Sequence, residues 1–193
     1  MANGALPLET AGKKHFTYAE YKNWNPDETG RYELIYGTAY AMSVPTLQHQ
    51  ELLTQLLVEI GTFLRGNPCR VYAAPVDVRL FYGEDENDDT VVQPDLIVIC
   101  DEKKRGSEAC RGAPEFVVEI LSPSNTASEM ERKFELYRQA GVGEYWVIDP
   151  QNKILHARHF HDGQILTRFF GKNDTAPVET LKGLEIALAP VFA

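Results

Sequence analysis

Apolar positions recur along this chain with two different periods. Residues 46–65 and 127–140 repeat them every three or four positions, which predicts two amphipathic helices. Shorter apolar runs predict strands at 71–81, 91–100, 115–121 and 144–148. The resulting order of helix, three strands, helix and strand indicates an α/β (α+β) fold, in which helices flank a mixed sheet.

Weaker patterns add elements at both ends of this core. Two hairpins are predicted, an N-terminal one over 31–36 and 38–42 and a C-terminal one over 153–160 and 164–170. Thr17 and Glu20 have the spacing of a capping box, which predicts a short helix. Residues 1–14 are polar and unpatterned, so we expect them to be flexible, and we expect the tail after residue 170 to be irregular. A chain of 193 residues with 44% hydrophobic content suits one domain spanning residues 1–193.

The net charge and its distribution along the chain argue against some classes of function. A net charge of −9 argues against a protein that coats nucleic acid through bulk charge. Five acids fall within residues 84–89, and we expect this acidic run to be a solvated loop, because it lacks the ligand spacing of a calcium site. The main basic cluster comprises Lys103, Lys104, Arg105 and Arg111.

The cysteines and the apolar runs predict a cellular setting. No apolar run approaches the roughly 18 residues of a membrane span, and the N-terminus lacks the apolar segment of a secretory signal. Cys69, Cys100 and Cys110 are odd in number and form no CxxC pair, so they favour neither a disulfide framework nor a structural zinc site. We therefore expect a protein of the reducing cytoplasm.

Two carboxylates stand where apolar side chains are expected. Glu119 interrupts the apolar run of 115–121, and Asp95 follows Pro94 at the start of a buried segment. A buried carboxylate is costly without a cation or several donors, so Glu119 indicates either a structural salt bridge or a functional site. Two carboxylates that converge from adjacent strands would suit Mg²⁺ or Mn²⁺.

Each predicted helix also carries one polar residue in its apolar stripe. Lys133 lies in the apolar arc of 127–140, where it either snorkels to solvent or points at the carboxylates of the sheet. His49 lies in the stripe of 46–65, either as a hydrogen-bonded core residue or as a group that contacts phosphate or takes part in catalysis.

In chain order, Glu33, Asp95, Glu119 and Lys133 resemble the active-site residues of the PD-(D/E)-x-K nuclease superfamily. More narrowly, the chain is similar over roughly residues 15–170 to the Uma family of restriction-endonuclease-like proteins. The matching stretches are YELIYGTAYAMSVPTLQHQ (32–50), AAPVDVRL (73–80), VQPDLIVICD (92–101), GAPEFVVEILSPSN (112–125) and KFELYRQAGVGEYWVIDP (133–150). The resemblance implies a restriction-endonuclease-like domain with hairpin additions at both ends.

The resemblance also implies a metal site. Asp95 and Glu119 would hold Mg²⁺ or Mn²⁺ together with the backbone carbonyl of Ile120. Glu33 would be a further acidic ligand or would orient water.

Around that metal, the resemblance implies a catalytic lysine and a substrate pocket. Lys133 would stand in for the superfamily's lysine, whose usual place two residues after Glu119 is taken here by Leu121. His49 and Tyr137 are candidates for substrate binding, although Tyr137 could equally pack in the core.

The implied activity is that of a Mg²⁺-dependent DNA endonuclease that hydrolyses phosphodiester bonds. One alternative is a catalytically silent module that keeps the fold and binds nucleic acid or acts as a scaffold. Another is a hydrolase of a different phosphodiester. Nucleases of this superfamily often dimerise, so the resemblance also implies a homodimer, although the sequence carries no interface signature.

Overall fold

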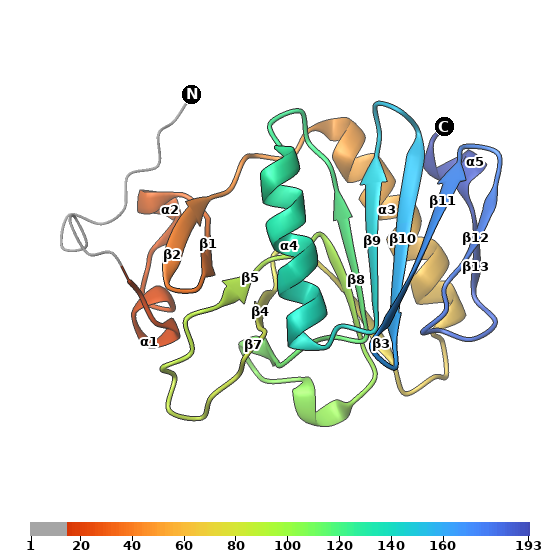
Figure 1. The fold of residues 1–193 in the computed structure, drawn as a ribbon. Helices are drawn as coiled ribbons and strands as arrows, with labels where there is room; N and C mark the ends of the chain where they lie inside the picture. The colour runs from red at the N-terminus through yellow and green to blue at the C-terminus, as the bar shows by residue number, and fades with distance from the viewer. Residues whose placement is uncertain (1–14) are drawn as a thin grey trace.

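The computed structural model describes residues 15–193 and is built on a six-stranded mixed sheet (Figure 1). The strand order is β11-β10-β9-β8-β6-β3, with β8 and β9 parallel and the other pairs antiparallel. The strands are β3 (Arg70–Ala73), β6 (Leu96–Ile99), β8 (Phe116–Ile120), β9 (Glu144–Asp149), β10 (Ile154–His161) and β11 (Gln164–Gly171). The expected mixed sheet is therefore confirmed, and the C-terminal hairpin extends it as β10 and β11.

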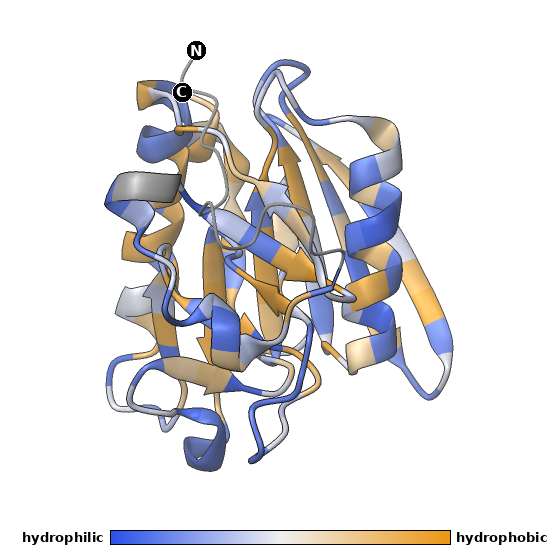
Figure 2. Ribbon diagram, turned by 90° about the vertical axis from the view of Figure 1, so that its left-hand side faces the viewer, coloured by the Kyte–Doolittle hydropathy of each residue, from blue (hydrophilic) through white to orange (hydrophobic). Residues whose placement is uncertain are grey.

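Two long helices cover opposite faces of this sheet. One is α3 (Leu47–Phe63), which packs its leucines on one face, and the other is α4 (Ala127–Ala140), which packs Leu136 and Tyr137 on the other face. Figure 2 shows the result as hydrophobic strands between helices whose outer surfaces are largely hydrophilic. Both helices were predicted within two residues of their ends, because their capping signals are local. Thr46 and Thr126 cap the N-termini, and Gly141, at φ 86°, ends α4.

A second sheet of five short strands lies beside the first, in the order β2-β1-β5-β4-β7. Its strands are β1 (Tyr32–Ile35), β2 (Thr38–Ala41), β4 (Asp77–Arg79), β5 (Val91–Val92) and β7 (Ala109–Arg111). The predicted N-terminal hairpin is confirmed as β1 and β2.

Two of the predicted strands are in fact divided between the sheets. The run 71–81 becomes β3 in the larger sheet and β4 in the smaller one, and 91–100 becomes β5 and β6. Pro75 and Pro94 stand at the breaks, and neither has an N–H to donate to a ladder. Apolar runs alone do not reveal that the chain changes sheet at these prolines.

Segments expected to be irregular also hold regular structure. The tail forms β12 (Thr175–Pro177), β13 (Glu185–Ala187) and α5 (Leu188–Val191), which bury apolar side chains against the α3 face of the sheet. The polar loop after β6 contains a 3-10 turn, η2 (Glu102–Lys104), as well as β7. Near the N-terminus, α1 (Tyr18–Tyr21) was predicted, whereas α2 (Pro26–Thr29) replaces a predicted turn. Each missed element is at most four residues long, which is too short for a periodic signal. The flexibility expected for residues 1–14 lies outside the described residues.

The acidic run 84–89 is a loop, as expected, but it is only partly solvated. Asp88 forms an ion pair with Arg79, and its side chain is only 2% exposed. Glu86 pairs with Lys22 at 2.5 Å, and Asp89 lies 2.9 Å from His15. The run therefore holds the N-terminal segment and β4 together through contacts that are distant in sequence.

The cysteines also depart from the expectation of no disulfide. Cys69 and Cys100 are joined by a disulfide, and Cys110 is free and buried. The antiparallel register of β3 and β6 pairs Arg70 with Ile99, so the two cysteines that flank this pair lie opposite one another. Among the residues that the structure describes, no helix is both long enough and apolar enough to cross a membrane.

Candidate functional site

A cavity of about 380 Å³ opens where the carboxyl end of β8 meets α3, α4 and the smaller sheet. Five of the residues singled out from the sequence line it: Glu33, His49, Asp95, Glu119 and Lys133. They come from five different segments of the chain, and the nearest two along the sequence are 14 residues apart. Ile120 also lines this cavity, which we call the acidic pocket.

Lys133 is a buried cation held between two carboxylates. Its Nζ donates to Glu119 Oε1 at 2.9 Å and to Glu33 Oε1 at 3.1 Å. The residue is only 7% exposed, so it does not snorkel to solvent. Burial alone would lower its pKa, but the charges of Glu119 and Glu33 raise it, so the amine stays protonated.

Glu119 carries more negative charge around it than one lysine offsets. Burial raises the pKa of Glu119 to about 7, with Asp95 and Glu33 adding to the rise and Lys133 opposing it. The metal-free carboxyl therefore keeps its proton to a higher pH than an ordinary glutamate does. A second cation in the acidic pocket would therefore stabilise the ionised form of Glu119.

Tyr137 forms a hydrogen bond with Glu119 from within the core. Its hydroxyl donates to Glu119 Oε1 at 2.6 Å, and the side chain is fully buried. The substrate-binding role considered for Tyr137 therefore does not fit this arrangement, because its side chain lies beneath Glu119 and outside the lining of the acidic pocket. It fixes the position of the carboxylate.

Asp95 and His49 form a second pair across the acidic pocket. Asp95 Oδ2 accepts the N–H of Ile120 at 2.7 Å and lies 3.1 Å from His49 Nε2. Burial lowers the pKa of His49, but the hydrogen bond and charge of Asp95 outweigh it and raise the pKa overall. His49 Nδ1 is buried and has no hydrogen-bond partner among the described residues.

The donor set of the acidic pocket fits a hard divalent cation. Asp95 and Glu119 line the same cavity, and they are close enough for the Asp95 charge to raise the pKa of Glu119. Among residues 15–193, no group of three or more His, Cys, Asp or Glu side chains is arranged to hold a metal. A Mg²⁺ ion held by Asp95, Glu119 and the Ile120 carbonyl would have three protein ligands. Its other coordination positions would be filled by water or substrate, as Mg²⁺ prefers.

Several contacts at this site had no signal in the sequence. The N–H of Gln93 donates to Glu33 Oε1 at 2.9 Å, and the Gln93 side chain accepts from Arg31 Nε at 3.0 Å. Arg132 on α4 stacks over the ring of Tyr40, which also lines the acidic pocket, with its guanidinium 4.2 Å from the ring centroid. For Gln93, the only signal in the sequence was its place directly before Pro94. The arginines sit in polar stretches that match no motif.

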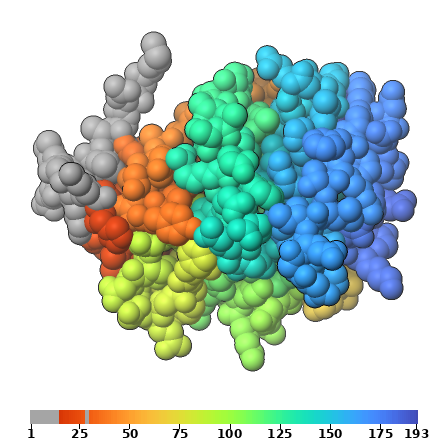
Figure 3. All heavy atoms as spheres, viewed as in Figure 1, coloured from red at the N-terminus to blue at the C-terminus, as the bar shows by residue number. Residues whose placement is uncertain are grey.

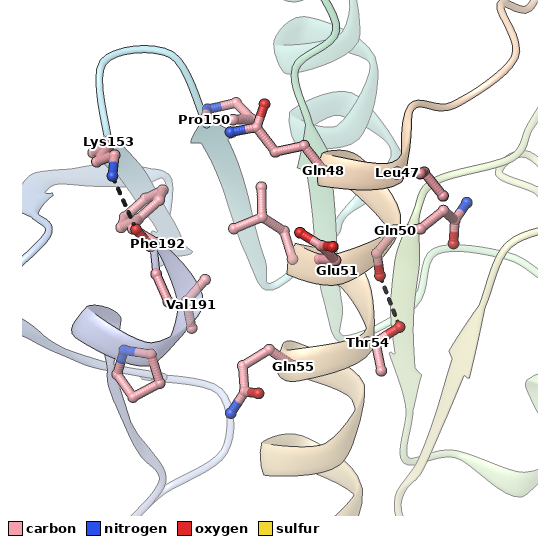
Figure 4. Close-up of a pocket in the computed structure, with 13 residues that line it drawn as sticks. Leu47, Gln48, Gln50, Glu51, Thr54, Gln55, Pro150, Lys153, Val191 and Phe192 are labelled. Carbon is pink, nitrogen blue, oxygen red and sulfur yellow. Dashed lines mark hydrogen bonds between the residues drawn. The ribbon is translucent and has the colours of Figure 1, made fainter.

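Two other features prove to lie apart from the acidic pocket. In the basic cluster, Lys104 pairs with Glu115 at 2.5 Å, beside the opposite end of β8. A larger cavity of about 420 Å³ lies between the outer side of α3 and the C-terminal helix, where Lys153 donates to the Phe192 carbonyl (Figure 4). None of the site residues predicted from the sequence lines it.

The mixed sheet flanked by helices, with hairpins added at both ends, makes this a restriction-endonuclease-like fold. The chain belongs to the Uma2 family, described as "Putative restriction endonuclease", whose model matches residues 18–189. It is similar to the "Uncharacterized protein slr1290" of Synechocystis sp., with 25% identity over 175 residues that cover 90% of this chain and 89% of the relative. A solved structure from Anabaena variabilis, titled a putative nuclease belonging to DUF820, superposes with a TM-score of 0.72 at 18% identity. The match covers 92% of this chain and 97% of that one.

Proposed function

We propose that this protein is a DNA endonuclease that hydrolyses phosphodiester bonds with Mg²⁺ or Mn²⁺ bound at Asp95, Glu119 and the Ile120 carbonyl. One observation carries most of the argument. The amine of Lys133 reaches Glu119 at 2.9 Å from the following helix, so a lysine accompanies the acidic pair although Leu121 occupies the usual lysine position. Membership of a family described as "Putative restriction endonuclease" supports the same reaction class.

In this proposal, Asp95, Glu119 and the Ile120 carbonyl would hold the metal, which would supply a Lewis acid for the scissile phosphate and would lower the pKa of a water molecule. Lys133 remains protonated, so it acts as a fixed cation that orients the attacking water and stabilises charge that develops on the phosphate. Glu33 holds Lys133 in place and accepts from water at the edge of the acidic pocket. His49 orients Asp95 through Nε2.

The lining of the acidic pocket explains how a chain of net charge −9 could receive a polyanion. Arg31 lines the pocket, and Arg132 stacks on Tyr40 at its border. Hydroxyl and amide groups of Ser122, Ser124 and Asn125 line the pocket beyond β8 and can donate to phosphate or sugar oxygens. Local cations of this kind can hold a phosphate against an unfavourable overall charge.

The direct test is a cleavage assay on supercoiled plasmid and on single-stranded DNA with Mg²⁺, Mn²⁺ or EDTA. We expect cleavage with either metal and none in EDTA. Asp95→Asn should lower the rate by at least about 10²-fold, the scale for losing one electrostatic group at a reacting centre. Glu131→Gln, on the exposed side of α4, is the matched control and should cleave at the wild-type rate.

Metal binding separates the nuclease from the silent module. Titration calorimetry with Mn²⁺ should show one site in the wild type and none in Glu119→Ala, since one remaining carboxylate gives too little charge to hold a strongly hydrated ion. Equal binding by both proteins would remove the assigned metal site. A wild-type protein that binds Mn²⁺ and DNA but cleaves neither substrate would instead establish the silent module.

A further inference from the structure

The outer strand of the six-stranded sheet is long, apolar and open. The strand β11 is eight residues long and ends the strand order, and within residues 15–193 no strand pairs with its outer edge. Phe169 is 65% exposed, and Ile165 and Leu166 are each 45% exposed. Figure 3 shows the β10–β11 hairpin at the surface beside α4. Proteins usually block such an edge, because its free N–H and C=O groups can pair with another chain.

The hairpin geometry shows which residues of β11 face outward. Asp162 and Gly163, at φ 49° and 74°, form a two-residue turn between His161 and Gln164. Residues flanking such a turn are a hydrogen-bonded pair, and these pairs then alternate along the ladder. The backbone N–H and C=O groups that point away from β10 are therefore those of Ile165, Thr167 and Phe169.

These same three residues share one face of the sheet. Phe169 packs its ring edge-on against His156, with ring centroids 4.8 Å apart, and Ile165 lies opposite Phe160 in the ladder. Phe160 in turn contacts Phe134 of α4. The outward-facing amides thus coincide with the exposed apolar side chains on the α4 side of the sheet.

We propose that two copies of this chain pair antiparallel through β11 about a two-fold axis at Thr167, which joins their six-stranded sheets into one. This register places Ile165 opposite Phe169 twice and Thr167 opposite itself, so each exposed apolar side chain meets an apolar partner. Aromatic and β-branched pairs of this kind stabilise a sheet, and a closed two-fold contact leaves neither β11 edge free.

Charge favours the same register. Asp162, which is 85% exposed and lies 3.2 Å from His161 in the hairpin turn, would come near Lys172 of the second copy just beyond each end of the paired strands. The nearby charge of Lys153 lowers the pKa of Lys172, so these two lysines lie close together. The only charge within β11, Arg168, faces Leu166, so the register opposes no like charges.

The first test is the mass of the protein in solution, measured by light scattering during size exclusion. We expect a dimer for the wild type and a monomer for Thr167→Lys, which would set two like charges against each other on the axis. Val58→Lys, at a 57% exposed site on α3, is the matched control and should remain a dimer. Thr167 is exposed, and a melting curve for each variant verifies that it is folded.

The second test fixes the register by cross-linking. Under mild oxidation, Thr167→Cys should form a disulfide with its own copy. Phe169→Cys alone should not, because its two copies would lie about 13 Å apart, at about 3.3 Å per residue over four residues. A mixture of Ile165→Cys and Phe169→Cys proteins should cross-link. Cys110 is buried, and the other two cysteines are already bonded.

Three results would overturn the proposal. They are a monomeric wild type, a dimer that survives Thr167→Lys, and self-cross-linking of Phe169→Cys in place of Thr167→Cys. None of these results depends on nuclease activity, so the interface and the proposed function stand or fall separately.

Discussion

At the scale of single residues, the acidic pocket holds three carboxylates, two of which are bonded to one ammonium group. Lys133 is bonded to Glu33 and Glu119, while Asp95 adds negative charge beside Glu119 and lies 3.1 Å from His49 Nε2. Such a centre is stable enough to fold but remains short of positive charge. The shortage of positive charge would give the acidic pocket affinity for a metal ion. For the same reason, the loss of Lys133 and the binding of a metal should each change the stability of the folded protein.

Replacing the buried cation should destabilise the metal-free protein. Lys133→Met leaves two buried carboxylates without their partner, a change that typically costs about 3–5 kcal/mol, and protonation of Glu119 will recover part of this. We expect a clearly lower melting temperature in EDTA and a recovery on adding Mn²⁺ that exceeds the shift in the wild type. Combining Lys133→Met with Glu119→Gln should remove most of the loss. An unchanged melting temperature for the single variant would mean that the ion pairs contribute nothing.

The raised pKa of Glu119 predicts how stability depends on pH. Because the folded protein holds this proton up to about pH 7 while an unfolded glutamate releases it near 4.5, the associated stability is present at low pH and is lost as pH rises from 4.5 through about 7. In EDTA, the wild type should therefore lose melting temperature relative to Glu119→Gln between pH 5 and 8. The difference should fall steadily across this range, and about 1 kcal/mol corresponds to about 2–4 °C in Tm at this size. Parallel profiles for the two proteins would contradict the shift.

At the scale of elements, the acidic run acts as a connector between the N-terminal segment and the smaller sheet. Its most buried member, Asp88, pairs with Arg79 of β4, and the Arg79 guanidinium stacks on Tyr18 and Tyr82. The ion pair and the two rings hold α1, β4 and the loop in one arrangement. The loop therefore positions β1, the strand that carries Glu33 into the acidic pocket.

Removing this connector should cost stability in a residue-specific way. Asp88→Ala leaves a buried guanidinium without its carboxylate, and we expect a loss of about 3–5 kcal/mol in the free energy of unfolding, measured in urea. Glu84→Ala is the matched control, an exposed acid of the same run, and should change the value by less than about 0.5 kcal/mol. Equal effects of the two substitutions would indicate that the run acts only through its overall charge.

At the scale of the whole molecule, the C-terminal segment seals one face of the sheet. Glu144, the first residue of β9, is 1% exposed and accepts from Trp146 Nε1 at 2.7 Å and from the N–H of Thr180 at 2.9 Å. Around it, Ala176, Leu181 and Ile186 join the core that α3 covers. Glu144 therefore anchors the C-terminal segment, whose strands β12 and β13 are each only three residues long.

Loss of the hydrogen bonds to Glu144 should let the C-terminal segment open before the rest of the fold unfolds. Glu144→Ala leaves the buried donors of Trp146 and Thr180 unsatisfied, at about 1–3 kcal/mol each. Hydrogen exchange should accelerate across residues 175–187 and much less in β8. Glu185→Ala, an exposed acid of β13, is the control and should leave the exchange pattern unchanged. Uniform acceleration over the whole sheet would show that the segment does not open independently.

The sequence by itself determined the elements whose signals are local. The helices α3 and α4 follow from periodicity together with Thr46, Thr126 and Gly141, and the hairpins follow from alternation around their turns. It also singled out Lys133 as a charge inside an apolar arc, and left open whether the amine snorkels to solvent or meets the carboxylates of the sheet.

Only the tertiary structure decided which partners those residues have. It divided two predicted strands between sheets, buried Asp88 against Arg79, paired Cys69 with Cys100, and brought Glu33 from the smaller sheet to Lys133. Each of these contacts joins residues that are separated along the chain, by nine positions for Arg79 and Asp88 and by 100 for Glu33 and Lys133. Local propensity carries no information about such pairs, because their energy arises only when packing brings the two side chains together and excludes water from both.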